Sequence, residues 1–236
     1  AVAPVALLWL VPLALPTHWT SQAADPLRVA LLQGNLPQLS KWSAEGQRDA
    51  VNTYTRMTRQ QPDDADIIVW PETALPMFEQ QARPFMARLQ STLPPETSLL
   101  TGIVQRDEAG RYYNAITGVG DVRGEYRKSH LVPFGEFLPL DFLLRGIIDF
   151  FNLPMSDFAA GADSQPPILT HRVAIGSAIC YEIVYPDLVA ERARDANVLL
   201  TVSNDTWFGR SIGPLQHLQM AQLRALENGR YVIRAT

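Results

Sequence analysis

Short apolar runs alternate with amphipathic segments along most of the chain, and this alternation restricts the possible folds more than any other feature. Leu27–Gln33 is an apolar run typical of a buried strand, and a helical pattern then runs from Ser43, a good N-cap residue, to about Gln60. Further strands are predicted at 67–70, 99–105, 112–119, 172–180, 198–202 and 231–234, and helices at 78–93, 186–195 and 213–227. The turn Asp107–Gly110 predicts a hairpin. The pattern predicts an α/β sandwich in which helices cover sheets.

The last predicted helix carries a regular apolar stripe. Leu215, Leu218, Ala221 and Ala225 recur at helical spacing in this segment. This spacing predicts that these side chains form the buried face of the helix. The strand that follows is the last predicted element, which leaves a sheet unfinished and indicates that the C-terminal strands are truncated.

Charge is distributed unevenly along the chain. All 20 basic and 24 acidic residues lie at positions 25–236, and Ala1–Pro16 contains only apolar residues and proline. A complete bilayer span needs about 20 apolar residues. A signal peptide would begin with a basic region, which is absent here. We therefore expect residues 1–24 to be the remnant of a transmembrane segment and its linker, and residues 25–236 to form the catalytic domain.

Composition excludes several classes of protein. A net charge of −4 without clusters of Lys and Arg argues against nucleic-acid binding. With 47% hydrophobic and 19% charged residues, the chain is too apolar to be disordered. The single cysteine, Cys180, excludes an internal disulfide, and the four histidines lack the spacing of zinc ligands.

Residues 134–158 form an unusually aromatic segment. Six of the nine phenylalanines of the chain lie within these 25 residues, among them Phe142, Phe150 and Phe151. One interpretation is a core helix with long loops. The other is an apolar arm that enters the bilayer interface or covers an acyl chain. The uncharged N-terminal stretch favours the arm, because it would hold the domain beside a membrane.

Three polar residues follow apolar strands or begin loops, where ligand sites of α/β folds lie. They are Glu72, Lys128 and Cys180. A cysteine is a nucleophile as its thiolate, Glu72 is a candidate base for the thiol proton, and Lys128 a candidate for stabilising an oxyanion together with a backbone N–H beside Cys180. Together they would perform acyl transfer through a thioester.

Each of these residues also has a purely structural interpretation. A lone cysteine at a strand end is usually a small buried hydrophobe, Glu72 after Trp-Pro suits a helix cap, and Lys128 suits a solvated surface. Glu136 is unusual as a carboxylate within the most apolar segment. His217 is more often a satisfied histidine than a ligand at such a position.

The combination of motifs resembles the nitrilase superfamily, whose members carry a Glu-Lys-Cys triad in this chain order. Within it, the chain is most similar to the apolipoprotein N-acyltransferase family. The resemblance covers nearly all of 27–236 and rests on the segments QGNLPQ at 33–38 with KW at 41–42, WPETA at 70–74, YRKSHLVPFGE at 126–136, FNLPM at 151–155, ICYE at 179–182 and SNDTWFG at 203–209.

The resemblance implies a nitrilase-like α-β-β-α sandwich and a role for each matched residue. Glu72 would be the general base, Lys128 the oxyanion stabiliser and Cys180 the acylated nucleophile. Glu136 would be an auxiliary carboxylate. The remaining matched residues, which the family needs for activity or substrate handling, are Tyr181, Glu182 and Trp42.

The family resemblance also implies a reaction and a location. An acyl chain would pass from a phospholipid of the phosphatidylethanolamine type to the cysteine, and then to the α-amine of a diacylglyceryl-cysteine lipoprotein, at the periplasmic face of the bacterial inner membrane. It implies no metal or organic cofactor. Two alternatives stay open: a soluble nitrilase-type amidase that hydrolyses a small amide, and a non-catalytic, membrane-anchored binding domain.

Overall fold

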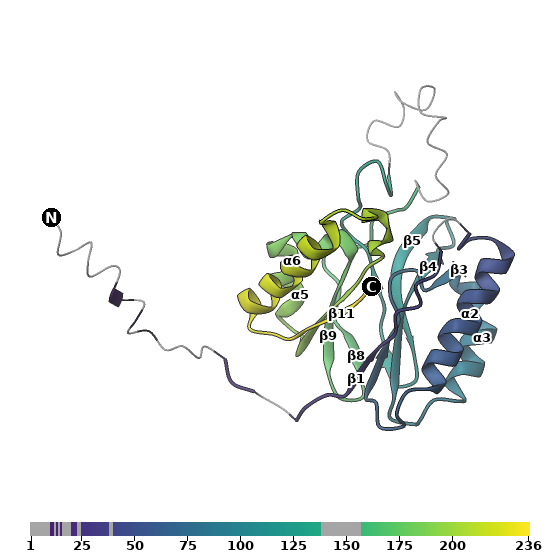
Figure 1. Cartoon of the computed structure of the whole chain (residues 1–236), viewed down its shortest axis with the longest axis horizontal. Helices are drawn as coiled ribbons and strands as arrows, with labels where there is room; N and C mark the ends of the chain where they lie inside the picture. The colour runs from purple at the N-terminus through teal and green to yellow at the C-terminus, as the bar shows by residue number, and fades with distance from the viewer. Residues whose placement is uncertain are drawn as a thin grey trace.

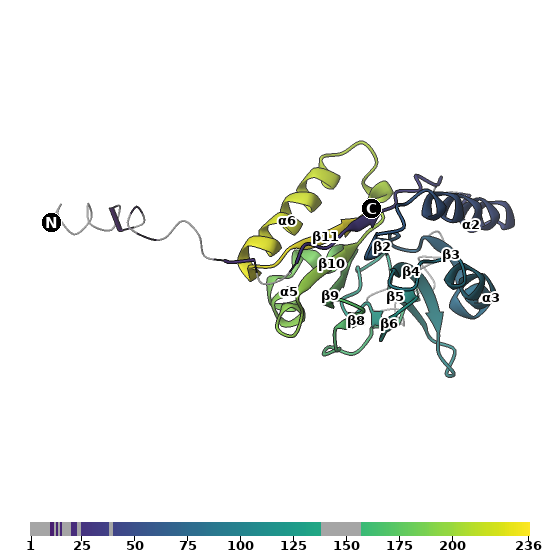
Figure 2. The ribbon, with the colours of Figure 1, turned by 90° about the horizontal axis from the view of Figure 1, so that it is seen from below.

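The structure, a computed structural model, describes residues 10, 11, 13, 15, 20–22, 25–37, 40–137 and 157–236. Among these residues, two β-sheets lie face to face, with a pair of helices covering the outer face of each (Figure 1, Figure 2). The α-β-β-α sandwich implied by the family resemblance is confirmed. The division at residues 24 and 25 stays a prediction.

The first sheet and its helices occupy the N-terminal half. Their bounds are β1 (Val29–Leu31), α2 (Ala44–Arg59), β2 (Ile67–Val69), β3 (Leu75–Phe78), α3 (Glu79–Gln90), β4 (Ser98–Arg106), β5 (Tyr112–Val119) and β7 (Tyr126–Arg127). The strand order is β1-β2-β4-β5-β7, with β3 paired to β4. β1, β2 and β4 are parallel, whereas β5 is antiparallel to both β4 and β7. The carboxyl ends of β2 and β7 therefore lie at the same edge.

The second sheet and its helices follow. Their bounds are β6 (Val122–Arg123), β8 (Ile168–Thr170), β9 (Ala174–Ile179), α5 (Pro186–Ala193), β10 (Val198–Val202), α6 (Gly213–Asn228) and β11 (Val232–Ala235). The order is β11-β10-β9-β8-β6, and β9, β10 and β11 are parallel. A 3₁₀ turn follows β9 and another follows β10: η2 (Cys180–Val184) and η3 (Asp205–Phe208).

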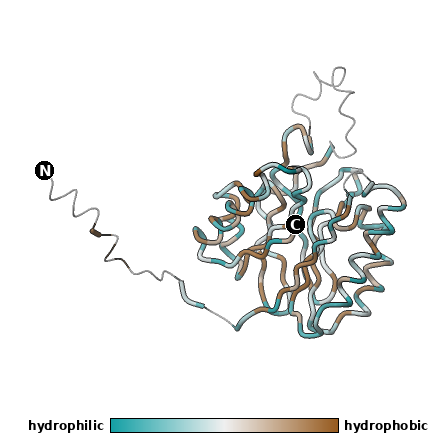
Figure 3. The backbone as a smooth tube through the Cα atoms, viewed as in Figure 1, coloured by the Kyte–Doolittle hydropathy of each residue, from teal (hydrophilic) through white to brown (hydrophobic). Residues whose placement is uncertain are grey.

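Apolar side chains fill the three spaces between the four layers. Between the first helix pair and its sheet, Tyr54 and Trp70 stack with ring centroids 4.9 Å apart. Between the two sheets, buried residues such as Leu100 and Leu200 belong to one cluster. Ala221 belongs to a smaller cluster under α5 and α6. Figure 3 shows that the strands between the helix layers are mainly hydrophobic, whereas α2 and α3 are largely hydrophilic.

Most of the predicted elements are found close to their expected positions. Ser43 caps α2 by accepting a hydrogen bond from Gly46 N at 3.0 Å, and β10 occupies the predicted range. Pro186 starts α5 as expected, because proline at the first helical position costs no hydrogen bond. The short strands β3, β6, β7 and β8 were not predicted.

The predicted face of α6 is confirmed at Ala221, which is buried, and wrong at the two leucines. Leu215 and Leu218 are 63% and 41% exposed, and the buried residues of the helix are His217, Ala221 and Arg224. His217 and Arg224 take the interior positions instead of the leucines. Arg224 Nη1 donates to the Val184 carbonyl at 3.4 Å, and the partners of His217 are described below.

Several predictions fall on segments outside the described residues. Most of the expected apolar arm lies outside them, including Phe142, Phe150 and Phe151. Most of the predicted transmembrane remnant lies outside them as well. At the start of the arm, Phe134 is described and is 63% exposed. No helix within the described ranges is long and apolar enough to cross a bilayer.

Candidate active site

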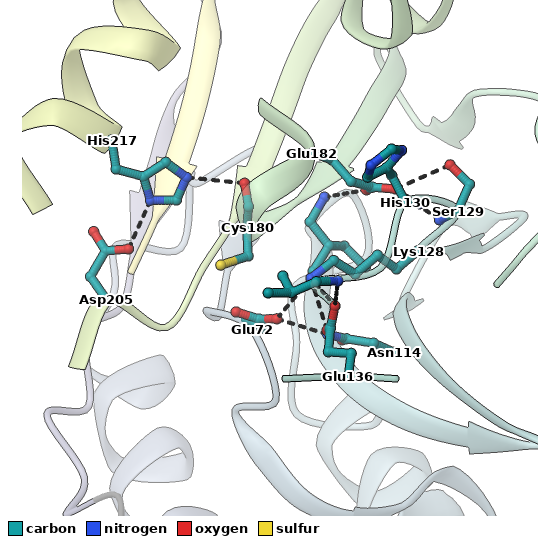
Figure 4. Close-up of polar contacts among 12 residues, drawn as sticks. Glu72, Asn114, Lys128, Ser129, His130, Glu136, Cys180, Glu182, Asp205 and His217 are labelled. Carbon is teal, nitrogen blue, oxygen red and sulfur yellow. Dashed lines mark hydrogen bonds and ion pairs between the residues drawn. The ribbon is translucent and has the colours of Figure 1, made fainter. Parts of the chain in front are cut away.

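The carboxyl ends of strands from both sheets bring the three predicted site residues together. Glu72 follows β2, Lys128 follows β7 and Cys180 follows β9. Figure 4 shows the Cys180 sulfur directed toward the Glu72 carboxylate, with Lys128 entering from the opposite sheet. These side chains therefore lie at the carboxyl ends of strands, where ligand sites of α/β folds are expected.

A buried lysine lies between two carboxylates at the centre of the site. Lys128 is 1% exposed, and its Nζ lies 2.8 Å from the carboxylate of Glu136 and 4.0 Å from Glu72 Oε1. Burial alone would lower the pKa of Lys128, but the charges of Glu72 and Glu136 raise it above its usual range. Lys128 therefore carries a positive charge, and its burial contradicts the solvated-surface interpretation.

Asn114, on β5, holds the two carboxylates in place. Its Nδ2 donates to Glu72 Oε1 at 2.7 Å and to Glu136 Oε1 at 3.1 Å. The sequence pattern did not predict a role for Asn114 in the site. The available signal was a polar side chain in the middle of a strand that is otherwise mainly apolar.

A close backbone approach sets the position of Glu72. Gly102 on β4 lies against this turn, and a Cβ there would come within 2.6 Å of Glu72 Cα. Gly102 N also donates to the Pro71 carbonyl at 3.2 Å. The next residue, Thr73, has a φ of 49°, so the chain turns sharply after the carboxylate. Glu72 therefore sits on a tight loop, which contradicts its helix-cap interpretation.

Cys180 stands at a strained junction between β9 and η2. Its φ is 52°, in the left-handed region, where a non-glycine residue costs about 1–3 kcal/mol. The residue keeps part of its surface accessible. Burial raises the pKa of the Cys180 thiol, the Glu72 charge raises it further, and the Lys128 charge acts in the opposite direction. The resting group is thus a thiol that needs a base to become a nucleophile.

Glu182 does not face Glu72 and Lys128, although it lies two residues after Cys180. It is fully buried, and its Oε1 accepts hydrogen bonds from the backbone of Ser129 at 2.7 Å and His130 at 2.9 Å. Its Oε2 accepts from Ile179 N at 2.7 Å. This carboxylate therefore ties the segment after Lys128 to the end of β9, and connects the two sheets at the site (Figure 4).

The other two matched residues lie at the margin of the site. Tyr181 is 37% exposed and packs edge-on against Tyr185 with ring centroids 5.3 Å apart, so it is not a core residue. Trp42 is half-buried in the turn before α2. Its neighbour Lys41 is buried. Burial lowers the pKa of Lys41 to about 8, although the charge of Glu72 acts to raise it. Lys41 thus places a second amine near the carboxylate.

This arrangement has the parts needed for acyl transfer. It combines a thiol, a carboxylate toward which the sulfur points and a buried ammonium group. Within the described ranges, no group of His, Cys, Asp and Glu side chains is arranged to hold a metal ion.

A family model describes the same region. Residues 28–236 match the model of the carbon-nitrogen hydrolase family. The chain belongs to the carbon-nitrogen hydrolase family. The match spans both sheets and all the residues of the site.

Within the carbon-nitrogen hydrolases, the chain is similar to curated apolipoprotein N-acyltransferases. The chain is 50% identical over 234 residues to the apolipoprotein N-acyltransferase of Pseudomonas aeruginosa PAO1, covering 97% of this chain and 46% of that protein. It is 42% identical over 234 residues to the enzyme of the same name from Vibrio vulnificus, covering 93% of this chain and 46% of that protein. The chain thus spans about half the length of the curated relatives it matches.

Solved structures of other carbon-nitrogen hydrolases share the fold. A superfamily protein from Xanthomonas campestris aligns with a TM-score of 0.64 at 18% identity, covering 89% of this chain and 76% of that one. The carbon-nitrogen hydrolase from Helicobacter pylori G27 aligns with a TM-score of 0.59 at 16% identity, covering 80% and 68%. At such identities the likeness concerns the fold alone.

Proposed function

We propose that the protein is an N-acyltransferase that moves an acyl chain from a phospholipid to the N-terminal amine of a diacylglyceryl-cysteine lipoprotein, through a thioester on Cys180. The observation that carries the proposal is the 50% identity, over nearly the whole chain, to curated apolipoprotein N-acyltransferases. The convergence of Glu72, Lys128 and Cys180 supports it, because a thiol, a base and a cation are the groups that acyl transfer through a thioester needs.

In the first half-reaction, Cys180 takes the acyl chain. Glu72 removes the thiol proton as the sulfur attacks the ester carbonyl of the phospholipid. The oxyanion faces Lys128 Nζ and the backbone N–H that follows Cys180. The ester C–O bond then breaks, Glu72 returns the proton to the departing oxygen, and a lysophospholipid leaves.

In the second half-reaction, the amine of the lipoprotein takes the acyl chain. The amine attacks the thioester carbonyl, Glu72 accepts a proton from the nitrogen, and the C–S bond breaks as the amide forms. Cys180 regains a proton from Glu72. Because one nucleophile serves both substrates in turn, ping-pong kinetics are expected.

Glu136 keeps Lys128 charged through this cycle. Glu72 alternates between carboxylate and carboxylic acid, so its attraction for the ammonium is lost in each half-reaction. Glu136 contacts Nζ at 2.8 Å and takes no proton in the mechanism, which leaves one fixed negative charge beside Lys128 throughout.

Both substrates are lipids, which places the site at a membrane. We propose the periplasmic face of the bacterial inner membrane, with a donor of the phosphatidylethanolamine type. The exposed Phe134 supports lipid contact at the start of the apolar arm. An apolar cover would also exclude water from the thioester, and so prevent hydrolysis of the donor.

The amidase alternative differs in the acceptor, so product analysis separates the two functions. Full-length protein would be given a phospholipid with a mass-labelled acyl chain and a synthetic lipopeptide that begins with a diacylglyceryl-cysteine whose α-amine is free. We expect triacylated lipopeptide as the main labelled product, measured by mass spectrometry.

A lipopeptide whose α-amine is acetylated serves as the matched control, and should yield no triacylated product. Labelled free fatty acid as the sole product with both lipopeptides would instead identify a hydrolase. Release of a small amide's acyl group, with phospholipid untouched, would point to the amidase.

A further inference from the structure

His217 links the candidate nucleophile to a buried charge network. The imidazole is 4% exposed, and its Nε2 lies 3.0 Å from the carbonyl oxygen of Cys180. Its Nδ1 lies 2.9 Å from Asp205 Oδ1 (Figure 4). The three residues come from α6, η3 and η2, so this contact joins three elements at the carboxyl end of the second sheet.

Asp205 is itself fixed and ionised. Arg234 on β11 donates to Asp205 Oδ2 at 2.5 Å. Burial alone would raise the pKa of Asp205, but the hydrogen bond from His217 and the Arg234 charge lower it below its usual value. His217 thus has an acceptor beside each ring nitrogen, a carboxylate and a carbonyl, and Arg234 Nη2 lies 3.4 Å from the same Nδ1.

The carbonyl that His217 holds belongs to the peptide group between Cys180 and Tyr181. A trans peptide group is planar, and its N–H points opposite to its C=O. Fixing the Cys180 carbonyl on the His217 side therefore fixes the direction of the Tyr181 N–H on the other side. That N–H lies in the first turn of η2, where N–H groups lack acceptors within the helix.

We propose that Asp205 and His217 form a positioning pair that locks the Cys180–Tyr181 peptide group and thereby aims the Tyr181 N–H at the oxyanion. The proposal rests on Cys180 being the acylated nucleophile. Neither residue touches the substrate. The φ of 52° at Cys180 is strained, so without a contact that holds it this backbone would relax toward commoner conformations. The hydrogen bond to His217 supplies such a contact.

The same end of β10 also reaches the thiol itself. The backbone N–H of Asn204 hydrogen bonds to the Cys180 sulfur, and Asp205 is the next residue. The segment therefore acts on Cys180 at two points: on the sulfur directly through Asn204, and on the carbonyl indirectly through Asp205 and His217. A histidine that only filled space in the core would not need both ring nitrogens placed on acceptors.

Two substitutions at His217 separate positioning from packing. A Gln amide nitrogen lies as many bonds from Cβ as His Nε2 does, so His217→Gln keeps a donor for the Cys180 carbonyl. An Asn amide nitrogen matches Nδ1 in the same way, so His217→Asn keeps the Asp205 bond and loses the Cys180 bond. If His217 only fills space, the effect of each variant should not depend on which hydrogen bond it keeps, and Asn and Gln should both impair the site.

Two reagents on the full-length protein supply the readout. p-Nitrophenyl acetate acylates Cys180 through an oxyanion, whereas iodoacetamide alkylates it at a saturated carbon and forms none. We expect His217→Asn to slow acylation about 100-fold, the effect of losing one oxyanion donor, and to change alkylation less than about fivefold. His217→Gln should keep acylation within about tenfold of the wild type.

Equal losses in both reactions, or wild-type acylation in His217→Asn, would overturn the positioning pair. A wild type that p-nitrophenyl acetate does not acylate would overturn the proposed nucleophile as well, so the two failures are distinct. If His217→Asn does not fold, Asp205→Ala takes its place and should show the same selective loss. Asp205→Asn, whose amide still bonds Nδ1, should retain acylation, and equal behaviour of these two variants would contradict the proposal.

Discussion

Replacing Lys128 with Met is expected to slow acylation of Cys180 by about 10²–10³-fold, the usual effect of losing one group that stabilises an oxyanion. The fold should be destabilised as well. Glu72, which is buried, and Glu136, which is partly buried, would remain without their shared cation, and breaking a buried pair in this way costs about 3–5 kcal/mol. Single-turnover acylation and thermal unfolding would measure the two effects.

The double variant Lys128→Met/Glu136→Gln separates stability from catalysis. Removing one carboxylate relieves the repulsion, so part of the lost stability should return. The acylation rate should stay low, because the positive charge that faces the oxyanion is still absent. A double variant that recovers both properties would show that Lys128 serves the fold alone, and near-normal acylation in Lys128→Met would rule out its proposed role.

Replacing Glu72 with Gln is expected to have opposite effects on turnover and on thiol alkylation. Acylation should fall by about 10²–10⁴-fold, because the base that moves the thiol proton is lost. Asn114 can still donate to the amide oxygen at this position, so the geometry should be retained.

Alkylation by iodoacetamide should become faster in the Glu72→Gln variant. Burial is the main cause that raises the pKa of Cys180, but the Glu72 charge raises it further. Removing that charge lowers the pKa, so at any pH below it a larger fraction of Cys180 is thiolate. Lys128→Met should do the reverse, because the Lys128 charge lowers the same pKa. Slower alkylation in Glu72→Gln across the pH range would contradict this assignment of charges.

The sequence contains strong signals for the framework of the site. Glu72 and Cys180 follow predicted strands, and ligand sites of α/β folds lie at the carboxyl ends of strands, so a shared site was expected. That the two residues meet across the two sheets, with Lys128 between them, came only from the fold. Ser43 and Pro186 marked helix starts because caps and first-turn prolines act locally. Such features depend on a few neighbouring residues and need no knowledge of packing.

Features that depend on packing across elements were missed. The leucine spacing in α6 predicted a buried face, yet His217 takes the interior position because Asp205 and the Cys180 carbonyl lie there. Asn114 binds Glu72 from 42 residues away, a separation that no local pattern encodes. Polar side chains within apolar strands and stripes were the available sign, and their partners came only from the fold.

The central claim is that Cys180 carries the acyl chain as a thioester, and the mass of the protein tests this most directly. Full-length wild type would be incubated with a phospholipid of defined acyl chains, without acceptor, and its intact mass recorded. We predict one added acyl mass that hydroxylamine removes, and none in Cys180→Ala. The absence of any adduct in a wild type that turns over lipopeptide, or an equal adduct in Cys180→Ala, would contradict the account.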